Sequence, residues 1–125
     1  MIVGIGMDIC DVRRMARELS LPDGGFRDSV FTPDEIAYCE GKRYPARHLS
    51  ARLAAKEAVF KALALERSEG FLWQQAEIRS DEAGRPSLVL HGRLRELAER
   101  RGVRSVHVAL SHTDSLATAN VVLEA

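Results

Sequence analysis

Cysteine is scarce in this 125-residue sequence, aromatic residues are few, and neither sign of charge is in excess. The two cysteines, Cys10 and Cys39, form no CxxC pair and fit no zinc-site spacing, so we expect free thiols in a reducing compartment. The 18 basic and 18 acidic residues cancel, and aromatic residues make up only 6%. This balance argues against a nucleic-acid-binding protein, which needs positive charge and, for single strands, aromatic stacking surfaces.

Long hydrophobic runs are also missing. No apolar stretch approaches the roughly 20 residues that a membrane span needs, and the N-terminus lacks the basic and apolar segments of a signal peptide. We therefore expect a cytoplasmic protein with no membrane association. The length predicts one domain over residues 1–125. P-loop, GxGxxG and GxSxG motifs are absent, and the four histidines lack zinc spacing.

Strand and helix patterns alternate along the chain. Alternating apolar residues predict strands at 2–9, 73–80, 86–91, 104–110 and 117–124. A helix capped by Asp11 follows the first strand, and Thr32 with Glu35 forms the capping box of a short helix that ends near Gly41. A long helix is expected at 45–64 and a later one ending at Gly102. Residues 20–25 read as a loop. The order predicts an α+β fold with a small, largely antiparallel sheet packed with a long central helix.

The helix at 45–64 combines apolar and charged positions in an unusual way. At about 100° per residue, leucine and phenylalanine side chains form one stripe and alanines lie opposite, which is typical of a helix packed on both sides. Arg52 and Lys56 nevertheless fall within or beside the apolar stripe, and Glu57 and Lys61 lie at its edge, one turn apart. Charges on a buried helix are costly unless they are paired or used. Either these residues bind a ligand, or they form a surface ion pair with basic stems that reach solvent.

Charge is also clustered around this helix. Between residues 42 and 61 only Glu57 opposes six basic residues, namely Lys42, Arg43, Arg47, Arg52, Lys56 and Lys61. This excess favours an anionic ligand, and a divalent cation would explain the lone carboxylate, because Mg²⁺ prefers one or two carboxylates together with phosphate oxygens. Asp8 is the candidate for a second carboxylate. Its strand face carries Gly4 and Gly6, which let a neighbour approach closely. The alternative is that Asp8 only caps the following turn, although Asp11 suits that role better.

Three further groups of polar residues stand at turns or on an outer helix face. His112 and Thr113 lie in a Ser-His-Thr-Asp turn, and His112 either supports the turn by hydrogen bonding or contacts a phosphate. The Gly84-Arg85-Pro86 turn by itself indicates only a hairpin. The last group, on the helix that follows Asp11, is a basic face that is either simply solvated or complementary to an acidic partner, and consists of Arg13, Arg14 and Arg17.

Three blocks of the sequence together resemble the holo-[acyl-carrier-protein] synthases, the small 4′-phosphopantetheinyl transferases. Residues 2–9, IVGIGMDI, are similar to the family's opening GIGxDI. Residues 31–35, FTPDE, are followed by LSARLAAKEAVFKA at 49–62, which resembles the family's FLAxRFAAKEAxxKA. Residues 108–119, VALSHTDSLATA, are similar to its VSxSHxxxxAxA. The order and spacing of the blocks cover nearly the whole chain.

The resemblance implies a reaction and a set of roles. It implies transfer of the 4′-phosphopantetheine arm of coenzyme A to a serine of apo acyl carrier protein, within fatty acid biosynthesis, with Mg²⁺ as cofactor and adenosine 3′,5′-bisphosphate as product. Asp8 and Glu57 would hold the metal, Lys61 would touch the reacting phosphate, and Glu57 or a metal-bound water would take the serine proton. The nucleotide and its phosphates would be held by Arg52, Lys56, Lys61, His112 and Thr113, with Gly84, Arg85 and Pro86 near the adenine.

The resemblance also implies partners. Carrier proteins are acidic, so Arg13, Arg14 and Arg17 would form the carrier-binding face, and the family forms homotrimers with sites at subunit interfaces. One segment departs from the family. After Lys61-Ala-Leu the family continues with Gly-Thr-Gly or similar, whereas this chain reads ALERSEG over residues 64–70. The altered loop suggests a carrier protein of a dedicated polyketide or other secondary pathway, and it motivates the alternative of a non-catalytic carrier-protein-binding module.

Overall fold

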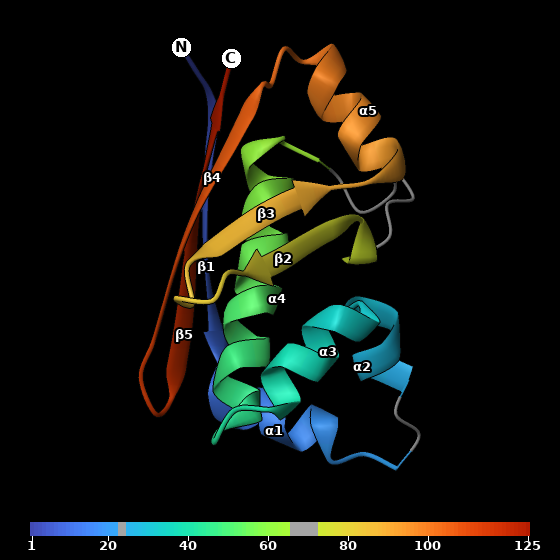
Figure 1. Cartoon of the computed structure of the whole chain (residues 1–125), viewed down its shortest axis with the longest axis vertical. Helices are drawn as coiled ribbons and strands as arrows, with labels where there is room; N and C mark the ends of the chain where they lie inside the picture. The colour runs from blue at the N-terminus through green and yellow to red at the C-terminus, as the bar shows by residue number, and fades with distance from the viewer. Residues whose placement is uncertain (23–24, 66–72) are drawn as a thin grey trace.

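The computed structural model describes residues 1–22, 25–65 and 73–125. Five strands and five α-helices are assigned in these ranges, with a short 3₁₀ turn at Trp73–Gln75 before the second strand. Figure 1 shows the longest helix running through the middle of the molecule, with a sheet on one side and both chain ends at one pole. In chain order the elements are β1 (Ile2–Asp11), α1 (Val12–Leu19), α2 (Gly25–Val30), α3 (Pro33–Glu40), α4 (Pro45–Ala62), β2 (Ala76–Ser80), β3 (Pro86–Leu90), α5 (Gly92–Arg100), β4 (Ser105–His112) and β5 (Leu116–Glu124).

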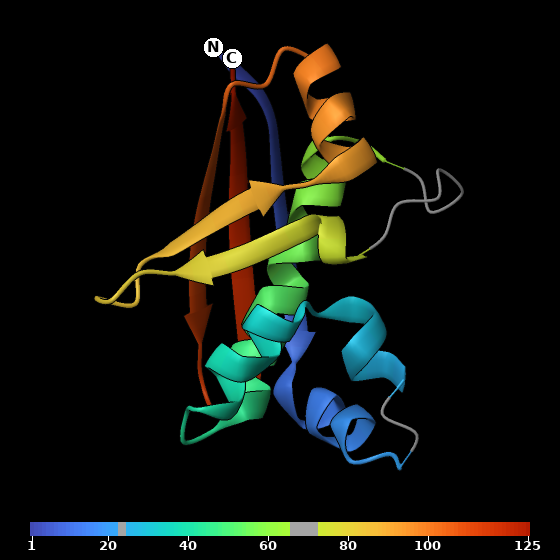
Figure 2. The ribbon, with the colours of Figure 1, turned by 45° about the vertical axis from the view of Figure 1, so that its right-hand side comes forward.

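The strands form two separate antiparallel sheets rather than one. Sheet A has the order β1-β5-β4, and sheet B is the β2–β3 hairpin alone. Figure 2 shows the hairpin crossing in front of α4, with its turn extending away from the helices. This arrangement confirms the α+β class and the central helix. It corrects the expected single sheet, because the strands of the hairpin pair only with each other among the described strands.

Helix α4 packs directly on the glycines of β1. A Cβ atom built on Gly4 would overlap the carbonyl oxygen of Ala62, and one on Gly6 would overlap that of Ala58. Glycine is therefore required at both positions by the closeness of the two backbones. The same helix buries Leu49 and a series of alanines against the strands and α3, as the two-sided pattern predicts.

Most helix boundaries follow the local signals in the sequence. The Asp11 carboxylate accepts from the backbone N–H groups of Arg13 and Arg14, which makes it the N-cap of α1. Thr32 and Glu35 form the predicted capping box of α3. Helix α2 was missed, and the expected loop 20–25 runs into it at Gly25. With six residues, α2 is too short to produce a readable helical periodicity.

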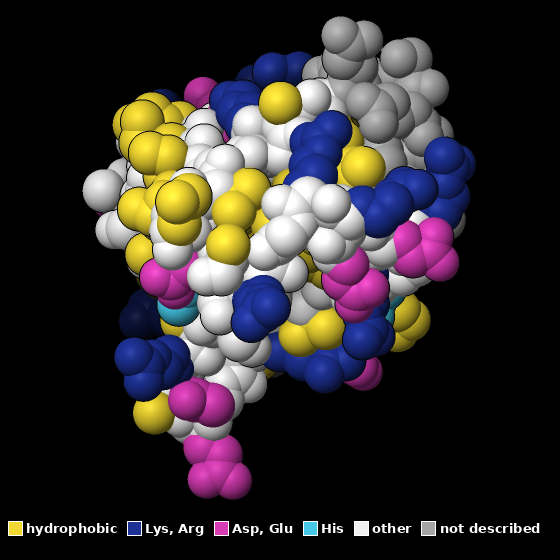
Figure 3. All heavy atoms as spheres, turned by 90° about the horizontal axis from the view of Figure 1, so that it is seen from above, with side chains coloured by type: hydrophobic (Ala, Val, Ile, Leu, Met, Phe, Trp, Pro, Cys, Tyr) yellow, Lys and Arg dark blue, Asp and Glu magenta, His cyan; other side chains and the backbone are white. Residues whose placement is uncertain are grey.

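The outer face of sheet A is apolar and exposed. The β1 side chains that point away from α4 are 57–69% exposed at Ile5, Met7 and Ile9. In Figure 3 hydrophobic side chains gather on the side of the molecule where sheet A lies in Figure 1. An uncovered apolar sheet face of this kind is typical of a protein–protein contact. In the described parts of the chain no helix combines the length and the apolar character that crossing a membrane requires.

Candidate functional site

Two pockets flank α4, and both contain residues singled out from the sequence. The first, called here the Asp8 pocket, has a volume of about 340 Å³ and is lined by Asp8, Ile9, Cys10, Asp11, Arg14, Met15, Glu18, Phe26, Leu53 and Glu57. The second, called here the Arg52 pocket, has a volume of about 410 Å³ and is lined by Tyr38, His48, Ala51, Arg52, Ser80, Gly84, Arg85, Pro86, Val108, Ala109, Leu110 and His112.

The Asp8 pocket brings the predicted metal ligands and Lys61 together. Asp8 points from β1 toward α4, and the Lys61 ammonium lies 2.8 Å from its Oδ1 and 3.3 Å from the Met7 carbonyl oxygen. The hydrogen bond with Asp8 raises the pKa of Lys61, and the nearby charge of Glu57 acts in the same direction. Lys61 is therefore a cation at neutral pH, next to two carboxylates and open to solvent.

The carboxylates of this pocket suit one kind of metal. Among the described residues no group of three or more histidine, cysteine or acidic side chains is arranged to hold a metal ion. A site with only Asp8 and Glu57 cannot enclose a metal, but it fits Mg²⁺, which keeps waters and takes phosphate oxygens from a bound substrate. The Asp8 side chain is 24% exposed, so it is accessible to such a substrate.

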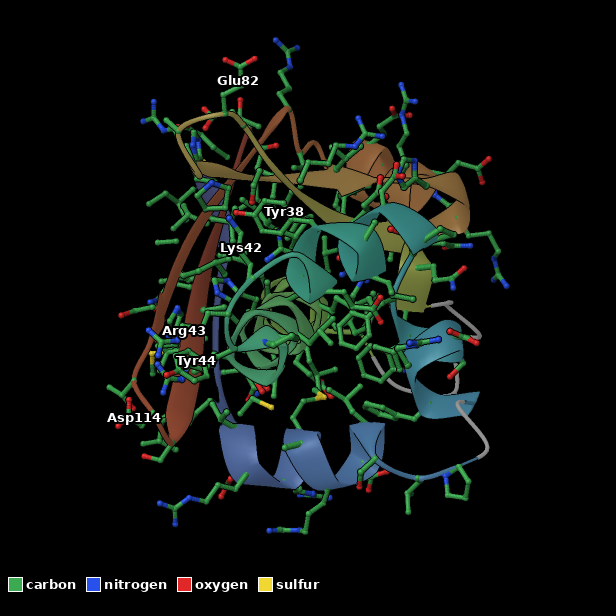
Figure 4. All side chains as sticks on the ribbon, turned by 60° about the horizontal axis from the view of Figure 1, so that its bottom comes forward. Tyr38, Lys42, Arg43, Tyr44, Glu82 and Asp114 are labelled. Atoms are coloured by element: carbon green, nitrogen blue, oxygen red, sulfur yellow. The ribbon has the colours of Figure 1, made fainter. Side chains whose placement is uncertain are left out.

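The Arg52 pocket is basic and partly aromatic. Arg52 is only 2% exposed, its Nη2 donates to the Ser80 hydroxyl at 3.0 Å, and its guanidinium lies 4.4 Å from the centre of the Tyr38 ring. Its buried Nε has no hydrogen-bond partner. The Lys42 ammonium approaches the same ring at 4.5 Å, and Figure 4 shows Tyr38 and Lys42 side by side. Stacked and anchored in this way, Arg52 presents a fixed positive charge.

The ionisable groups around this pocket respond to its positive field. Hydrogen bonding with Ser80 lowers the pKa of Tyr38, and the charges of Lys42 and Arg52 add to this effect. Burial lowers the pKa of His48, and His112, whose ring lies 5.1 Å away, contributes in the same direction. The charges of Lys42 and Arg52 contribute to both shifts, and the basic side chains around the pocket suit an anion such as a phosphate.

The turn after β4 differs from the expected one. His112 is the last residue of β4, and the turn itself begins at Thr113. The Thr113 N–H donates to the Leu116 carbonyl, and its hydroxyl accepts from the N–H groups of Ser115 and Leu116. These bonds give Thr113 a structural role in the turn, and its side chain does not line the Arg52 pocket.

The same turn is fastened to the start of α4. Asp114 accepts from Arg47 at 3.0 Å, and the Tyr44 ring lies between the guanidinium groups of Arg43 and Arg47, 5.2 Å and 4.0 Å from its centre. Figure 4 shows Arg43, Tyr44 and Asp114 gathered at the end of sheet A. Arg47 thus holds the turn that follows His112 to the start of α4, and Arg43 packs on the same Tyr44 ring.

Lys56 does not occupy the predicted position. The resemblance implied a contact with the nucleotide, but the Lys56 side chain is fully buried and lines neither pocket. Its ammonium is 2.8 Å from Glu35 Oε1, 2.6 Å from the Ala76 carbonyl and 3.2 Å from the Trp73 carbonyl. Burial lowers its pKa, and the Glu35 carboxylate opposes this shift. With all three donors used in the core, Lys56 has none left for a ligand.

The basic residues of α1 lie where the sequence predicts. Arg13, Arg14 and Arg17 are exposed, while Val12 and Met15 are buried against the core. Arg14 also lines the Asp8 pocket, so the basic face continues to the edge of the candidate metal site.

Three polar side chains of the Arg52 pocket were not identified from the sequence, namely Tyr38, His48 and Ser80. They come from three different elements, and none belongs to a recognisable motif. Only the spacing of Tyr38 and Lys42, one helical turn apart near the end of α3, was a usable signal.

The segment after α4 has the backbone conformation of a glycine turn, although its sequence lacks the glycine. Ala64 has a φ of +53°, a left-handed conformation that glycine adopts without strain. This is the position at which the resembled family carries glycine. Residues 66–70 of the altered loop lie outside the described residues.

The two pockets have no lining residue in common. Arg52 and Glu57 are five positions apart on α4, which places them roughly 140° from each other around the helix axis. Within one chain, the candidate metal ligands and the basic anion pocket therefore face different sides of the molecule.

Comparison with known proteins agrees with this geometry. Residues 4–119 match the model of the 4′-phosphopantetheinyl transferase superfamily. A holo-[acyl-carrier-protein] synthase of Syntrophus aciditrophicus is 43% identical over 124 residues, covering 99% of this chain and 97% of the relative. The chain therefore belongs to the 4′-phosphopantetheinyl transferase superfamily.

Two solved structures show the same fold. The crystal structure of holo-[acyl-carrier-protein] synthase from Neisseria meningitidis superposes with a TM-score of 0.88 at 29% identity, and all of both chains is covered. The holo-(acyl-carrier-protein) synthase from Bacillus anthracis in complex with CoA (3′,5′-ADP) gives a TM-score of 0.80 at 30% identity, covering 98% of this chain and 96% of that one.

Proposed function

We propose that this protein is a holo-[acyl-carrier-protein] synthase, which transfers the 4′-phosphopantetheine group of coenzyme A to a serine hydroxyl of an apo acyl carrier protein. The observation that carries the proposal is the meeting of Asp8 and Glu57 at one solvent-accessible pocket, with Lys61 bonded to Asp8, in a member of this superfamily. The neighbour from Bacillus anthracis with bound CoA supports coenzyme A as the substrate.

The residues of the Asp8 pocket account for the chemistry of phosphoryl transfer, which depends mainly on positioning and charge neutralisation. Asp8 and Glu57 hold Mg²⁺, whose chemistry here is to neutralise and orient the pyrophosphate oxygens. Lys61 places a positive charge where the transferred phosphate and the leaving group gain negative charge. Glu57 is also the candidate to accept the serine proton.

The Arg52 pocket binds the nucleotide half of coenzyme A in this proposal. Its anchored guanidinium and His112 provide donors for a phosphate, and the Gly84-Arg85-Pro86 turn forms a wall against which the adenine can lie. Thr113 shapes the turn beside His112, and Lys56 has no direct contact. The leaving product is adenosine 3′,5′-bisphosphate.

The carrier protein docks on α1 in this proposal. Arg13, Arg14 and Arg17 form an exposed basic face, and Arg14 leads from it to the Asp8 pocket. An acidic carrier bound there has its acceptor serine directed toward the reacting phosphate, and the charge complementarity accelerates the encounter. Two free cysteines agree with the reducing cytoplasm as the site of action.

We further propose a homotrimer in which each active site combines two copies. The Asp8 and Arg52 pockets of one chain face different sides of α4, so one coenzyme A can reach both kinds of pocket only when they come from neighbouring subunits. The exposed apolar side chains of Ile5, Met7 and Ile9 on β1 supply a surface for this contact.

The alternative, a non-catalytic carrier-protein-binding module, predicts binding through α1 without turnover of coenzyme A. The intact set of Asp8, Glu57 and Lys61 favours the enzyme, because a binding module has no need for these charges at one pocket. Nothing in the described residues favours the alternative.

Incubation with coenzyme A, Mg²⁺ and an apo carrier protein, followed by mass spectrometry of the carrier, tests the proposal. The expected result is a mass increase of one phosphopantetheine group that EDTA prevents. Carrier binding without a mass change would instead establish the binding module. Running a fatty-acid carrier and a polyketide carrier in parallel tests the pathway, since equal rates remove the support for a dedicated secondary pathway.

A further inference from the structure

Glu35 of α3 and Lys56 of α4 form an ion pair with both side chains fully buried, at 2.8 Å. Glu35 Oε1 also accepts from the Thr32 N–H, and Oε2 accepts from the Ile78 N–H at 3.1 Å. A buried ion pair loses much of its Coulomb energy to desolvation, and apolar side chains of similar volume are often as stable. Stability alone is therefore a poor explanation for two charges at this place.

Within residues 1–22, 25–65 and 73–125, the pair links three elements that no backbone hydrogen bond joins. Its bonds reach the start of α3, the middle of α4, and β2 through the Ala76 carbonyl and the Ile78 N–H. The β2–β3 hairpin shares no backbone ladder with sheet A among the described strands. Apolar packing of Ala76 and Ile78 also holds the hairpin, but such packing is non-directional and does not fix where β2 lies along α4.

Both pockets depend on where this pair holds the chain. The hairpin carries Ser80, which anchors Arg52, and the Gly84-Arg85-Pro86 turn of the Arg52 pocket. On the other side, Lys56 is followed directly by Glu57, so the rotation of α4 that buries Lys56 also directs Glu57 into the Asp8 pocket. The buried pair therefore acts on both the orientation of the metal-binding helix and the position of the nucleotide-binding hairpin, together with the Thr32–Glu77 and Arg52–Ser80 hydrogen bonds to β2.

We propose that Glu35 and Lys56 are positioning residues of the transferase, which act through Glu57 and the β2–β3 hairpin without touching the substrate. This inference rests on the proposed function, and it replaces the nucleotide contact that the sequence suggested for Lys56. Misplacement of the hairpin weakens nucleotide binding, and rotation of α4 slows the chemical step, because transfer requires close alignment of the reacting groups.

Three variants test the role of the pair. Glu35→Gln keeps the side-chain shape and a residue suited to the capping box, but in either orientation of its amide one N–H group loses its acceptor. Lys56→Met keeps a side chain of similar length but removes the hydrogen bond to the Ala76 carbonyl. The double variant E35Q/K56M carries no unpaired buried charge, so it folds even if a single variant does not. The matched control is Leu94→Ala, which opens the core at a buried residue of α5 that lines neither pocket.

The measurements are kcat, the KM for coenzyme A, the KM for the carrier, and the calorimetric Kd of adenosine 3′,5′-bisphosphate. All are made well below each melting temperature. The pair variants are expected to raise the KM for coenzyme A and the Kd by about tenfold and to lower kcat, as misaligned sites do. L94A is expected to lose stability with unchanged kinetics.

A folded E35Q/K56M variant with the Kd, KM and kcat of wild type would overturn the positioning role and leave the proposed function intact. A wild-type protein that loads no carrier in the same assay would refute both. Loss of activity in L94A equal to that of the pair variants would show that destabilisation alone is responsible, and would also overturn the positioning role.

Discussion

The Asp8 and Arg52 pockets lie on different sides of one helix and differ in how free their charged groups are. Beside the Asp8 pocket the Lys61 side chain is 55% exposed, and its ammonium bonds to the Asp8 carboxylate and the Met7 carbonyl. In the Arg52 pocket the guanidinium is buried, stacked on Tyr38 and bonded to Ser80. An open, adjustable charge suits a reacting phosphate whose charge changes, whereas an anchored charge suits a ligand that is only held.

Under the proposed function, this difference divides binding and chemistry between the two pockets. Changes in the Asp8 pocket are therefore expected to act on kcat, and changes in the Arg52 pocket on the KM for coenzyme A. A variant of the Asp8 pocket that changes only the KM for coenzyme A, or a variant of the Arg52 pocket that changes only kcat, would contradict this division.

The largest effect is expected from Glu57→Gln. The substitution removes the negative charge of one of the two predicted metal ligands without changing the size of the side chain. We expect carrier loading to fall by about 100- to 1,000-fold, because stabilisation of the transition state by the metal is worth several kcal/mol. Asp8→Asn is expected to behave in the same way. The measurement is kcat at saturating Mg²⁺. Glu18→Gln, in the same pocket but away from Lys61, is the control, and retained wild-type activity in both E57Q and D8N would remove the metal assignment.

A smaller effect is expected from His112→Ala. Loss of one hydrogen bond to a charged ligand should raise the KM for coenzyme A by about 10- to 100-fold, with little change in kcat. His91→Ala serves as control, because His91 likewise stands at the end of a strand, directly after β3, but lies outside both pockets. A fall in kcat without a change in KM would place His112 in the chemistry and contradict the division.

The carrier-binding face is expected to give a further, salt-dependent effect. Changing Arg13, Arg14 and Arg17 together to glutamine should raise the KM for the carrier by about tenfold, because exposed ion pairs contribute up to about 1 kcal/mol each. The KM for coenzyme A should not change. The same number of charges removed from α5 and the residue after it, with Arg95, Arg100 and Arg101 changed to glutamine, is the control. Equal effects from both sets would show a general charge effect and no docking face.

The smallest effect concerns the end of α4 just after Lys61. Ala64→Gly is expected to increase the free energy of unfolding by about 1 kcal/mol, because the left-handed conformation is strained for alanine. Ala16→Gly within α1 should have the opposite sign, since glycine weakens a helix interior. Denaturant unfolding measures both. Destabilisation by A64G would contradict the conformation of Ala64.

Local signals in the sequence were sufficient for much of the fold. The caps at Asp11 and at Thr32–Glu35 were predicted because each depends on residues three or fewer positions apart. Gly4 and Gly6 in the sequence indicated that a neighbouring element packs closely on β1, and that element is α4. The separate hairpin sheet could not be predicted, because strand pairing over long separations leaves no trace in periodicity.

The two lysines of α4 show which part of the site could not be predicted from the sequence. Helix periodicity and family resemblance placed both Lys56 and Lys61 near phosphate, yet Lys61 bonds to Asp8, which lines a pocket, whereas Lys56 lies in the core. What separates them is α3, β2 and the 3₁₀ turn before β2, which cover the Lys56 side of the helix and provide Glu35 and the carbonyls of Ala76 and Trp73. A single helix pattern contains no information on which element covers which side.

Mixing two variants, in an assay at a coenzyme A concentration near the KM of wild type where each variant alone loads little carrier, tests the central claim most directly. The central claim is that pockets of neighbouring copies form one transferase site. E57Q disables only the Asp8 pocket, and the double variant Arg85→Ala/His112→Ala disables only the Arg52 pocket. If the subunits are exchanged at equal amounts in a cyclic trimer, about a quarter of the interfaces combine two intact pockets, so carrier loading should recover to about a quarter of wild type. Loading that stays at the average of the two separate variants would contradict the shared site.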